Sequence, residues 1–139
     1  MGYAEKKDMA DKITFDLVSP ERLLLSAAAD MISLPGTEGD MGVMAGHMPL
    51  VSTLRPGIVT VTGGEDGGNF FVGGGFVEIS AEKCTVLAED AVSLDELNTE
   101  KLNAMIAEAD KESQSGVTDA IKTKAAARRD SLKQIKVVH

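Results

Sequence analysis

The spacing of apolar residues changes once along this chain, near residue 90. From about Lys12 to Asp90, apolar and polar residues alternate, which is typical of half-buried β-strands. After Asp90 the apolar residues recur every three or four positions, the spacing that places them on one face of an α-helix. This order predicts an α+β fold in which the strands come first and the helices last.

Turn signals divide the first part into short strands. Glycine and proline recur about every ten residues, which favours a β-sandwich or flattened barrel. We place this domain at residues 12–90, after a leader or extension at residues 1–11 that lacks the apolar core of a secretory signal. The triple glycine at 73–75 lies between two strands and is interpreted as a tight hairpin turn.

The second part, residues 91–139, reads as two helices. Ser93 and Glu96 have the spacing of a capping box, so a helix is expected to begin there. The SQSG stretch at 113–116 ends it, and a second helix follows, so the pair forms an antiparallel hairpin. The first apolar face comprises Leu102, Met105, Ile106 and Ala109, and the second comprises Val117, Ile121, Ala125, Leu132 and Ile135, interrupted by Arg128.

Charge is distributed unevenly along the chain. The formal net charge of −8 argues against nonspecific nucleic-acid binding. Residues 1–90 carry all of the excess negative charge. Residues 94–113 hold two basic and six acidic side chains, whereas residues 117–139 hold six basic and two acidic ones. Side by side in a hairpin, these segments attract each other by about a few tenths of a kcal/mol per exposed pair. The residues alone leave open whether the hairpin only packs or also opens.

The sequence offers little for catalysis or for a cofactor. Gly46 is followed by His47 rather than by the Lys-Ser or Lys-Thr of a phosphate loop, and no serine lies in a G-x-S-x-G motif. Cys84 stands alone in a strand pattern, which suits a small buried residue and a reducing compartment and does not suit a zinc ligand. We therefore expect no catalytic residue, metal or cofactor. No apolar run is long enough to cross a bilayer, so we expect no direct membrane insertion.

The glycine-rich stretch at 39–57 looks most like a site. Glu38 and Asp40 are close enough for a carboxylate pair, but two acids on such a stretch more often are solvated or meet a basic partner. His47 has an equally plain interpretation as a loop residue whose ring bonds to nearby backbone. The partner interpretation is preferred for the two acids.

Five ordered motifs give this chain a resemblance to a known family. They are FDLVSPE at 15–21, LPGTEGDMGV at 34–43, GHMPL at 46–50, LRPG at 54–57 and GGFVEI at 74–79. With the strand-then-helix order, they resemble the epsilon subunit of the bacterial rotary proton-translocating ATP synthase, which is equivalent to the mitochondrial delta subunit. The resemblance runs from Ile13 to the C-terminus.

The resemblance implies a fold, partners and site residues. It implies a ten-stranded sandwich with a helical hairpin, bound to the gamma subunit and the c-ring at the foot of the central stalk, on the cytoplasmic face of the bacterial plasma membrane. Glu38, Asp40 and His47 would then contribute to the surface that faces the c-ring. In bacterial members the hairpin can extend and hinder ATP hydrolysis among the catalytic alpha and beta subunits. Four charges would serve that role: Lys122, Lys124, Arg128 and Arg129.

One motif departs from the family pattern. Some bacterial members bind ATP through a Leu/Ile-Asp-x-x-Arg-Ala motif, which here reads LDELNT at 94–99, so Asn98 replaces the arginine. Asp95, Arg128 and Arg129 remain as weak ATP candidates, but the missing charge-assisted contact, commonly worth about 1.5 to 3 kcal/mol, leads us to expect weak ATP binding or none. The alternative hypothesis is a free-standing module that senses a nucleotide, and an enzyme ranks third.

Overall fold

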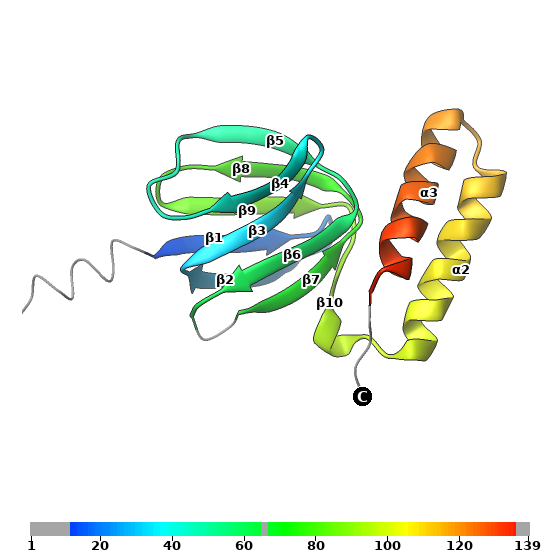
Figure 1. The fold of residues 1–139 in the computed structure, drawn as a ribbon, viewed down its shortest axis with the longest axis horizontal. Helices are drawn as coiled ribbons and strands as arrows, with labels where there is room; N and C mark the ends of the chain where they lie inside the picture. Colours follow the sequence, from blue (N-terminus) through cyan, green and yellow to red (C-terminus); the bar gives the residue numbers. More distant parts are fainter. Residues whose placement is uncertain (1–11, 65–66, 136–139) are drawn as a thin grey trace, which may run out of the picture.

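The computed structural model describes residues 12–64 and 67–135, so the predicted leader at 1–11 lies outside the described residues. These residues form ten strands followed by a 3-10 turn and two helices (Figure 1). The prediction of a ten-stranded sandwich followed by an antiparallel hairpin is confirmed. The strands are β1 Ile13–Val18, β2 Leu23–Ala29, β3 Met31–Gly36, β4 Gly39–Val43, β5 Leu50–Leu54, β6 Gly57–Thr62, β7 Gly68–Val72, β8 Gly75–Ile79, β9 Lys83–Ala88 and β10 Ala91–Ser93.

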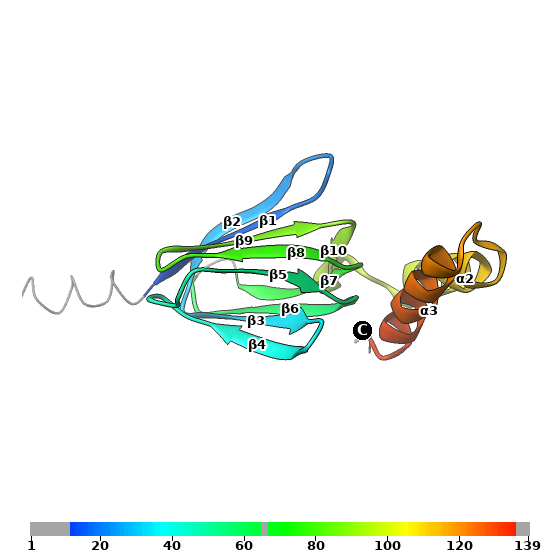
Figure 2. The same cartoon turned by 90° about the horizontal axis from the view of Figure 1, so that it is seen from above.

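The strands form one sheet that folds over on itself. Their order is β10-β7-β6-β3-β5-β8-β9-β1-β2, with β4 paired to β3. The β1–β9 pair is parallel, and the other pairs are antiparallel. Viewed from above, β1, β2, β8 and β9 lie in one layer and β3, β4 and β6 in the other (Figure 2). The inward side chains of both layers make the core, which includes Phe15, Leu17, Ile32, Leu34, Val59, Val77, Cys84 and Val86.

The sandwich has two distinct ends. The turns β3–β4, β5–β6, β7–β8 and β9–β10 lie at the end beside the helices, which we call the hairpin end (Figure 1). The β2–β3, β4–β5 and β8–β9 connections lie at the opposite, far end (Figure 1). Each candidate residue on a connection therefore belongs to one end or the other.

The first helix begins later than its sequence predicts. Ser93 caps only the 3-10 turn Leu94–Glu96, accepting a bond from the Asp95 amide at 3.2 Å. Helix α2, Thr99–Ser115, begins behind Asn98, whose side chain accepts from the Lys101 amide at 2.7 Å. The capping-box prediction at Ser93 is therefore wrong for the long helix. The cause is β10, because pairing with β7 keeps residues 91–93 extended, three residues past the predicted domain boundary.

Helix α3, Asp119–Lys133, runs antiparallel to α2 and is capped by Thr118 (Figure 1). Its buried side chains are Ala125 and Leu132. Val117 precedes the cap and is 92% exposed, so its assignment to the apolar face was wrong. The hairpin rests on β7 through a second apolar cluster, in which Phe71 and Leu132 are both fully buried.

Candidate functional site

Two ion pairs fasten α3 to the sandwich. Arg128 donates from Nη2 to Asp90 Oδ2 at 2.5 Å, and Lys124 donates to Glu89. The Arg128 guanidinium carbon also lies 5.8 Å from the centroid of the Phe71 ring, a cation–π distance. Because Glu89 and Asp90 occupy the β9–β10 turn, these four side chains connect α3 to the hairpin end. We call them the docking latch.

The triple glycine makes room for this latch. A Cβ added at Gly73 would lie 1.8 Å from Asp90 Oδ1 and 3.3 Å from Arg128 Nε. The Gly73 amide also donates to the Asp90 carbonyl at 2.9 Å. A side chain at residue 73 would therefore push the Asp90 carboxylate away from Arg128. The β7–β8 turn predicted from these glycines is present, and its first residue has this additional role.

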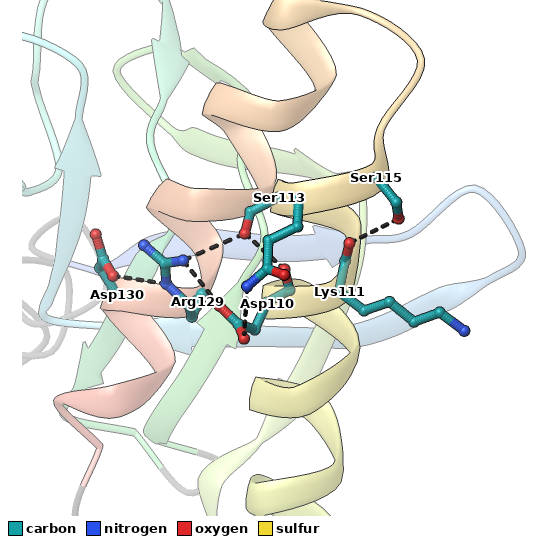
Figure 3. Close-up of polar contacts among 7 residues, drawn as sticks. Asp110, Lys111, Ser113, Ser115, Arg129 and Asp130 are labelled. Atoms are coloured by element: carbon teal, nitrogen blue, oxygen red, sulfur yellow. Dashed lines mark hydrogen bonds and ion pairs between the residues drawn. The ribbon is translucent and has the colours of Figure 1, made fainter.

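Arg129 fastens the two helices to each other instead. Its Nη1 donates to Asp110 Oδ1 at 2.9 Å and to Ser113 Oγ at 3.2 Å, both on α2, and its Nε donates to Asp130 at 3.0 Å (Figure 3). Hydrogen bonds to Asp130 and Asp110 raise the pKa of Arg129, so it stays charged at any working pH. Lys122 makes no ion pair with any residue in the described ranges. The expected attraction between acidic α2 and basic α3 is thus limited to the Arg129–Asp110 pair among the described ion pairs.

The acids of the glycine-rich stretch lie at the hairpin end. Glu38 is in the β3–β4 turn and Asp40 is the second residue of β4; both are exposed. Asp40 Oδ1 accepts from Arg55 Nη2 at 2.6 Å, so its basic partner is within this chain. Arg55 Nη1 donates to the Gly36 carbonyl, also at 2.6 Å. Beside this pair, a hollow of about 700 Å³ separates the sandwich from α3.

His47 lies at the far end, with β4 separating it from Asp40. Its Nδ1 is 2.7 Å from the Met48 carbonyl oxygen, and the neighbouring Gly46 amide donates to Ala81 in the β8–β9 turn at 2.8 Å. The backbone-bonding interpretation of His47 is confirmed. His47 does not lie beside Glu38 and Asp40, because the stretch 39–57 is not one loop but contains the strands β4 and β5.

The strand pattern alone did not predict one feature of the sandwich, an exposed apolar row. On the outer face, paired residues of four strands bring together Phe76, Leu87, Val18 and Leu23, of which Phe76 is 55% exposed. Phe76, Leu87 and Val18 line a shallow hollow of about 230 Å³. The sequence contains a signal for this row. Phe76-Val77 and Val86-Leu87 place large apolar residues on both faces of their strands, whereas a half-buried strand needs them on one face only.

The neighbouring row of the same face is polar. Asp16 accepts from Ser26 Oγ at 2.7 Å and lies 3.0 Å from Lys83 Nζ. The Ser26 hydrogen bond, together with Lys83, holds the pKa of Asp16 below its ordinary value, against the opposing effect of partial burial. The outer face is thus divided into an apolar row near the hairpin end and a polar row beside it.

Other predicted chemistry can be located as well. Burial raises the pKa of the Cys84 thiol to about 12, so it is unreactive. In the described part of the chain, no group of three His, Cys or acidic side chains has the arrangement of a metal site. No helix among the described residues is long and apolar enough to cross a membrane.

Comparison with known proteins identifies the family. Residues 12–94 match the model of the ATP synthase delta/epsilon chain β-sandwich domain. The chain belongs to the ATP synthase delta/epsilon family.

Relatives in this family match the helices as well as the sandwich. The chain is 48% identical over 129 residues to the ATP synthase epsilon chain of Parvibaculum lavamentivorans, covering 92% of this chain and 98% of the relative. It is 44% identical over 119 residues to that of Rhodospirillum rubrum, covering 85% and 89%. Since only ten of 139 residues lie outside the first match, most of the hairpin is included.

Solved structures agree with this assignment. A chain in the Euglena gracilis mitochondrial ATP synthase, solved as OSCP, F1 and c-ring, matches with a TM-score of 0.67 and 28% identity, covering 88% of this chain and 78% of that one. A chain of the Tetrahymena thermophila mitochondrial ATP synthase central stalk and c-ring shares the fold, with a TM-score of 0.60 and 19% identity over 88% and 92%.

The ATP candidates of this delta/epsilon chain are dispersed. Asp95 lies in the 3-10 turn before α2, Arg128 is in the docking latch, and Arg129 faces Asp110. Asn98, which stands at the motif's arginine position, is occupied as the N-cap of α2. Each arginine is already paired with a carboxylate, Arg128 with Asp90 and Arg129 with Asp110.

Proposed function

We propose that this chain is a rotor subunit of the central stalk of a proton-translocating ATP synthase, where it couples the gamma subunit to the c-ring. The observation that carries the proposal is the 48% identity to an ATP synthase epsilon chain, which extends over sandwich and hairpin alike. The chain acts without catalysing a reaction itself. It is a peripheral component on the cytoplasmic face of the bacterial plasma membrane.

The exposed apolar row is the proposed surface for the gamma subunit. An exposed Phe and two exposed Leu side chains in one row resemble the apolar centre of a protein interface, and the charged row beside it resembles the polar rim. A subunit that transmits rotation needs its binding surface on a rigid part of the fold. Four paired strands, which cannot move independently, carry the row.

The β3–β4 turn is the proposed contact with polar loops of the c-ring. Glu38 and Asp40 are exposed there, and Asp40 is ordered by Arg55. Because His47 lies at the opposite end, it is assigned to a different surface.

The hairpin is proposed to restrain ATP hydrolysis when it leaves the sandwich. In the closed structure Lys124 and Arg128 are neutralised by Glu89 and Asp90. Release of α3 would free both cations for acidic surfaces of the catalytic alpha and beta subunits. While the hairpin is docked, Lys124 and Arg128 are therefore not available to bind other subunits.

Reconstitution tests the proposal. The purified chain is added to the same organism's ATP synthase lacking this subunit, and both proton pumping and ATP hydrolysis are measured. Restored coupling is expected, and a chain truncated after Leu97 should restore coupling without restraining hydrolysis. Tight ATP binding by the isolated chain, with no binding to the gamma subunit, would instead favour the nucleotide-sensing module.

A further inference from the structure

The turn between β3 and β4 carries Glu38 and leads into Asp40, the second residue of β4. It spans the four residues from Gly36 to Gly39 between β3 and β4, and Gly39 has a φ of +137°, which favours glycine. A Cβ at Gly36 would lie 2.6 Å from the Gly39 carbonyl oxygen, so the turn closes tightly on itself. Glycines allow this geometry but do not rigidify it. Pairing with Pro35 places the main chain of Asp40, whereas the orientation of the Asp40 carboxylate and of the turn depends on contacts from outside the turn.

Those contacts come from the end of β5. The Thr37 amide donates to the Thr53 carbonyl at 3.2 Å, and the two threonine hydroxyls are 2.9 Å apart. Arg55 contributes more, because its guanidinium reaches both sides of the turn: Gly36 on β3 and Asp40 on β4, each at 2.6 Å. The backbone amide of Arg55 donates to the Pro35 carbonyl at 2.9 Å, which fixes the main chain from which the side chain extends.

The two bonds of Arg55 use the planar fork of the guanidinium. Nη1 and Nη2 point in fixed, diverging directions, so one side chain holds a carbonyl and a carboxylate simultaneously. A lysine ammonium carries the same charge but has no rigid fork. The Asp40 side chain remains 72% exposed, and only its Oδ1 is engaged by Arg55. The pair therefore orients the carboxylate without covering it.

We propose that Arg55 is a positioning residue for the c-ring contact: it holds Asp40 and the β3–β4 turn in the one orientation in which the carboxylate meets the ring. This inference rests on the proposed function, in which Asp40 makes that contact. Arg55 acts through Asp40 and need not touch the ring. A positive charge at residue 55 without the planar guanidinium fork is not sufficient for this role.

A double-mutant cycle on the full chain tests the proposal. Arg55→Ala, Asp40→Asn and the double variant are measured for binding to membrane vesicles that carry the c-ring and have been stripped of F1. We expect each single variant to lose about tenfold in affinity, equivalent to about 1.4 kcal/mol, and the double variant to lose no more than either. Arg55→Lys should recover only part of the loss. Lys12→Ala, which breaks the Lys12–Asp30 ion pair at the far end, is the matched control and should bind normally.

Hydrogen exchange of the free chain supplies a readout that does not require the ring. Faster exchange of the Thr37 amide in Arg55→Ala, with an unchanged melting temperature, is expected. Additive losses in the cycle, or full recovery by Arg55→Lys, would overturn the positioning role while leaving the Asp40 contact intact. If Asp40→Asn binds as tightly as the parent, the proposed ring contact itself is wrong, whatever Arg55 does in the free chain.

Discussion

Replacing Arg128 by alanine should weaken the docking of the hairpin onto the sandwich, by a free energy that the structure allows us to estimate. The Arg128 side chain is 21% exposed and that of Asp90 is 45% exposed, so their ion pair is valued near the upper end for surface pairs, about 0.5–1 kcal/mol. The contact with Phe71 adds about 0.5–1 kcal/mol. Together these give about 1–2 kcal/mol, or an increase of about 5- to 30-fold in the ratio of undocked to docked chains.

Thiol labelling measures that ratio even when undocked chains are rare. Leu132 is fully buried in the apolar cluster that includes Phe71 of β7, so a cysteine placed there reacts with a thiol reagent only after the hairpin has left the sandwich. The native Cys84 does not interfere, because burial raises its pKa to about 12. Under conditions in which closing outpaces labelling, the labelling rate at residue 132 should rise about 5- to 30-fold in Arg128→Ala, following the opening equilibrium.

The matched control is Lys122→Ala. Lys122 is on the same helix and carries the same charge, but it makes no ion pair within the described residues. The labelling rate should therefore stay within about twofold of the parent, as is usual for surface substitutions. If the two variants accelerate labelling equally, the general charge of α3 and not the latch holds the hairpin. An unchanged rate in Arg128→Ala would refute the latch.

Three further predictions concern single positions. Gly73→Ala should accelerate the same labelling reaction, because its Cβ displaces the Asp90 carboxylate, and an unchanged rate would show that the β7–β8 turn can adjust. Asn98→Ala should cost about 0.5–2 kcal/mol of α2 stability and speed hydrogen exchange in the first helical turn, whereas equal exchange rates would show that the cap is dispensable. Asp16 has a folded pKa below its ordinary value of 3.8, so its stabilising contribution is full above that value and disappears as the pH falls through the folded pKa. The melting temperature of Asp16→Asn should therefore lie below that of the parent at pH 7 and converge with it in acid; a constant difference would contradict the assignment.

The sandwich and the hairpin were predictable because their information is local. Alternation marks strands, and a three-to-four spacing marks helices, whatever the strands later pair with. The start of α2 was not predictable in this way, because Ser93 and Asn98 are both good N-caps. Pairing of residues 91–93 with β7 decides between them, and that pairing joins segments about twenty residues apart.

Closeness in sequence does not bring Asp40 and His47 together in the fold. Asp40 and His47 are seven residues apart, but strand β4 continues from Asp40 to Val43, and these three steps along a strand extend about 10 Å. The contacts that define both ends come from distant segments: Arg55 beside Asp40, and Ala81 beside Gly46. The sequence shows that the stretch is glycine-rich, whereas only the fold shows that Asp40 and His47 lie at different ends of the sandwich.

The distribution of contacts indicates how the hairpin leaves the sandwich. The helices pack on each other far more extensively than either packs on the strands, and Arg129 adds an ion pair between them. Undocking as a closed pair exposes Phe71 and breaks the docking latch, whereas separating the helices also exposes faces that bury Leu102 and Ala109. Full burial of one large apolar side chain such as Leu102 is worth about 1.5–3 kcal/mol, so separating the helices costs at least about that much more than undocking the closed pair. The hairpin should therefore leave the sandwich as a unit, and an extended pair of helices requires a partner surface that replaces the apolar contacts they lose.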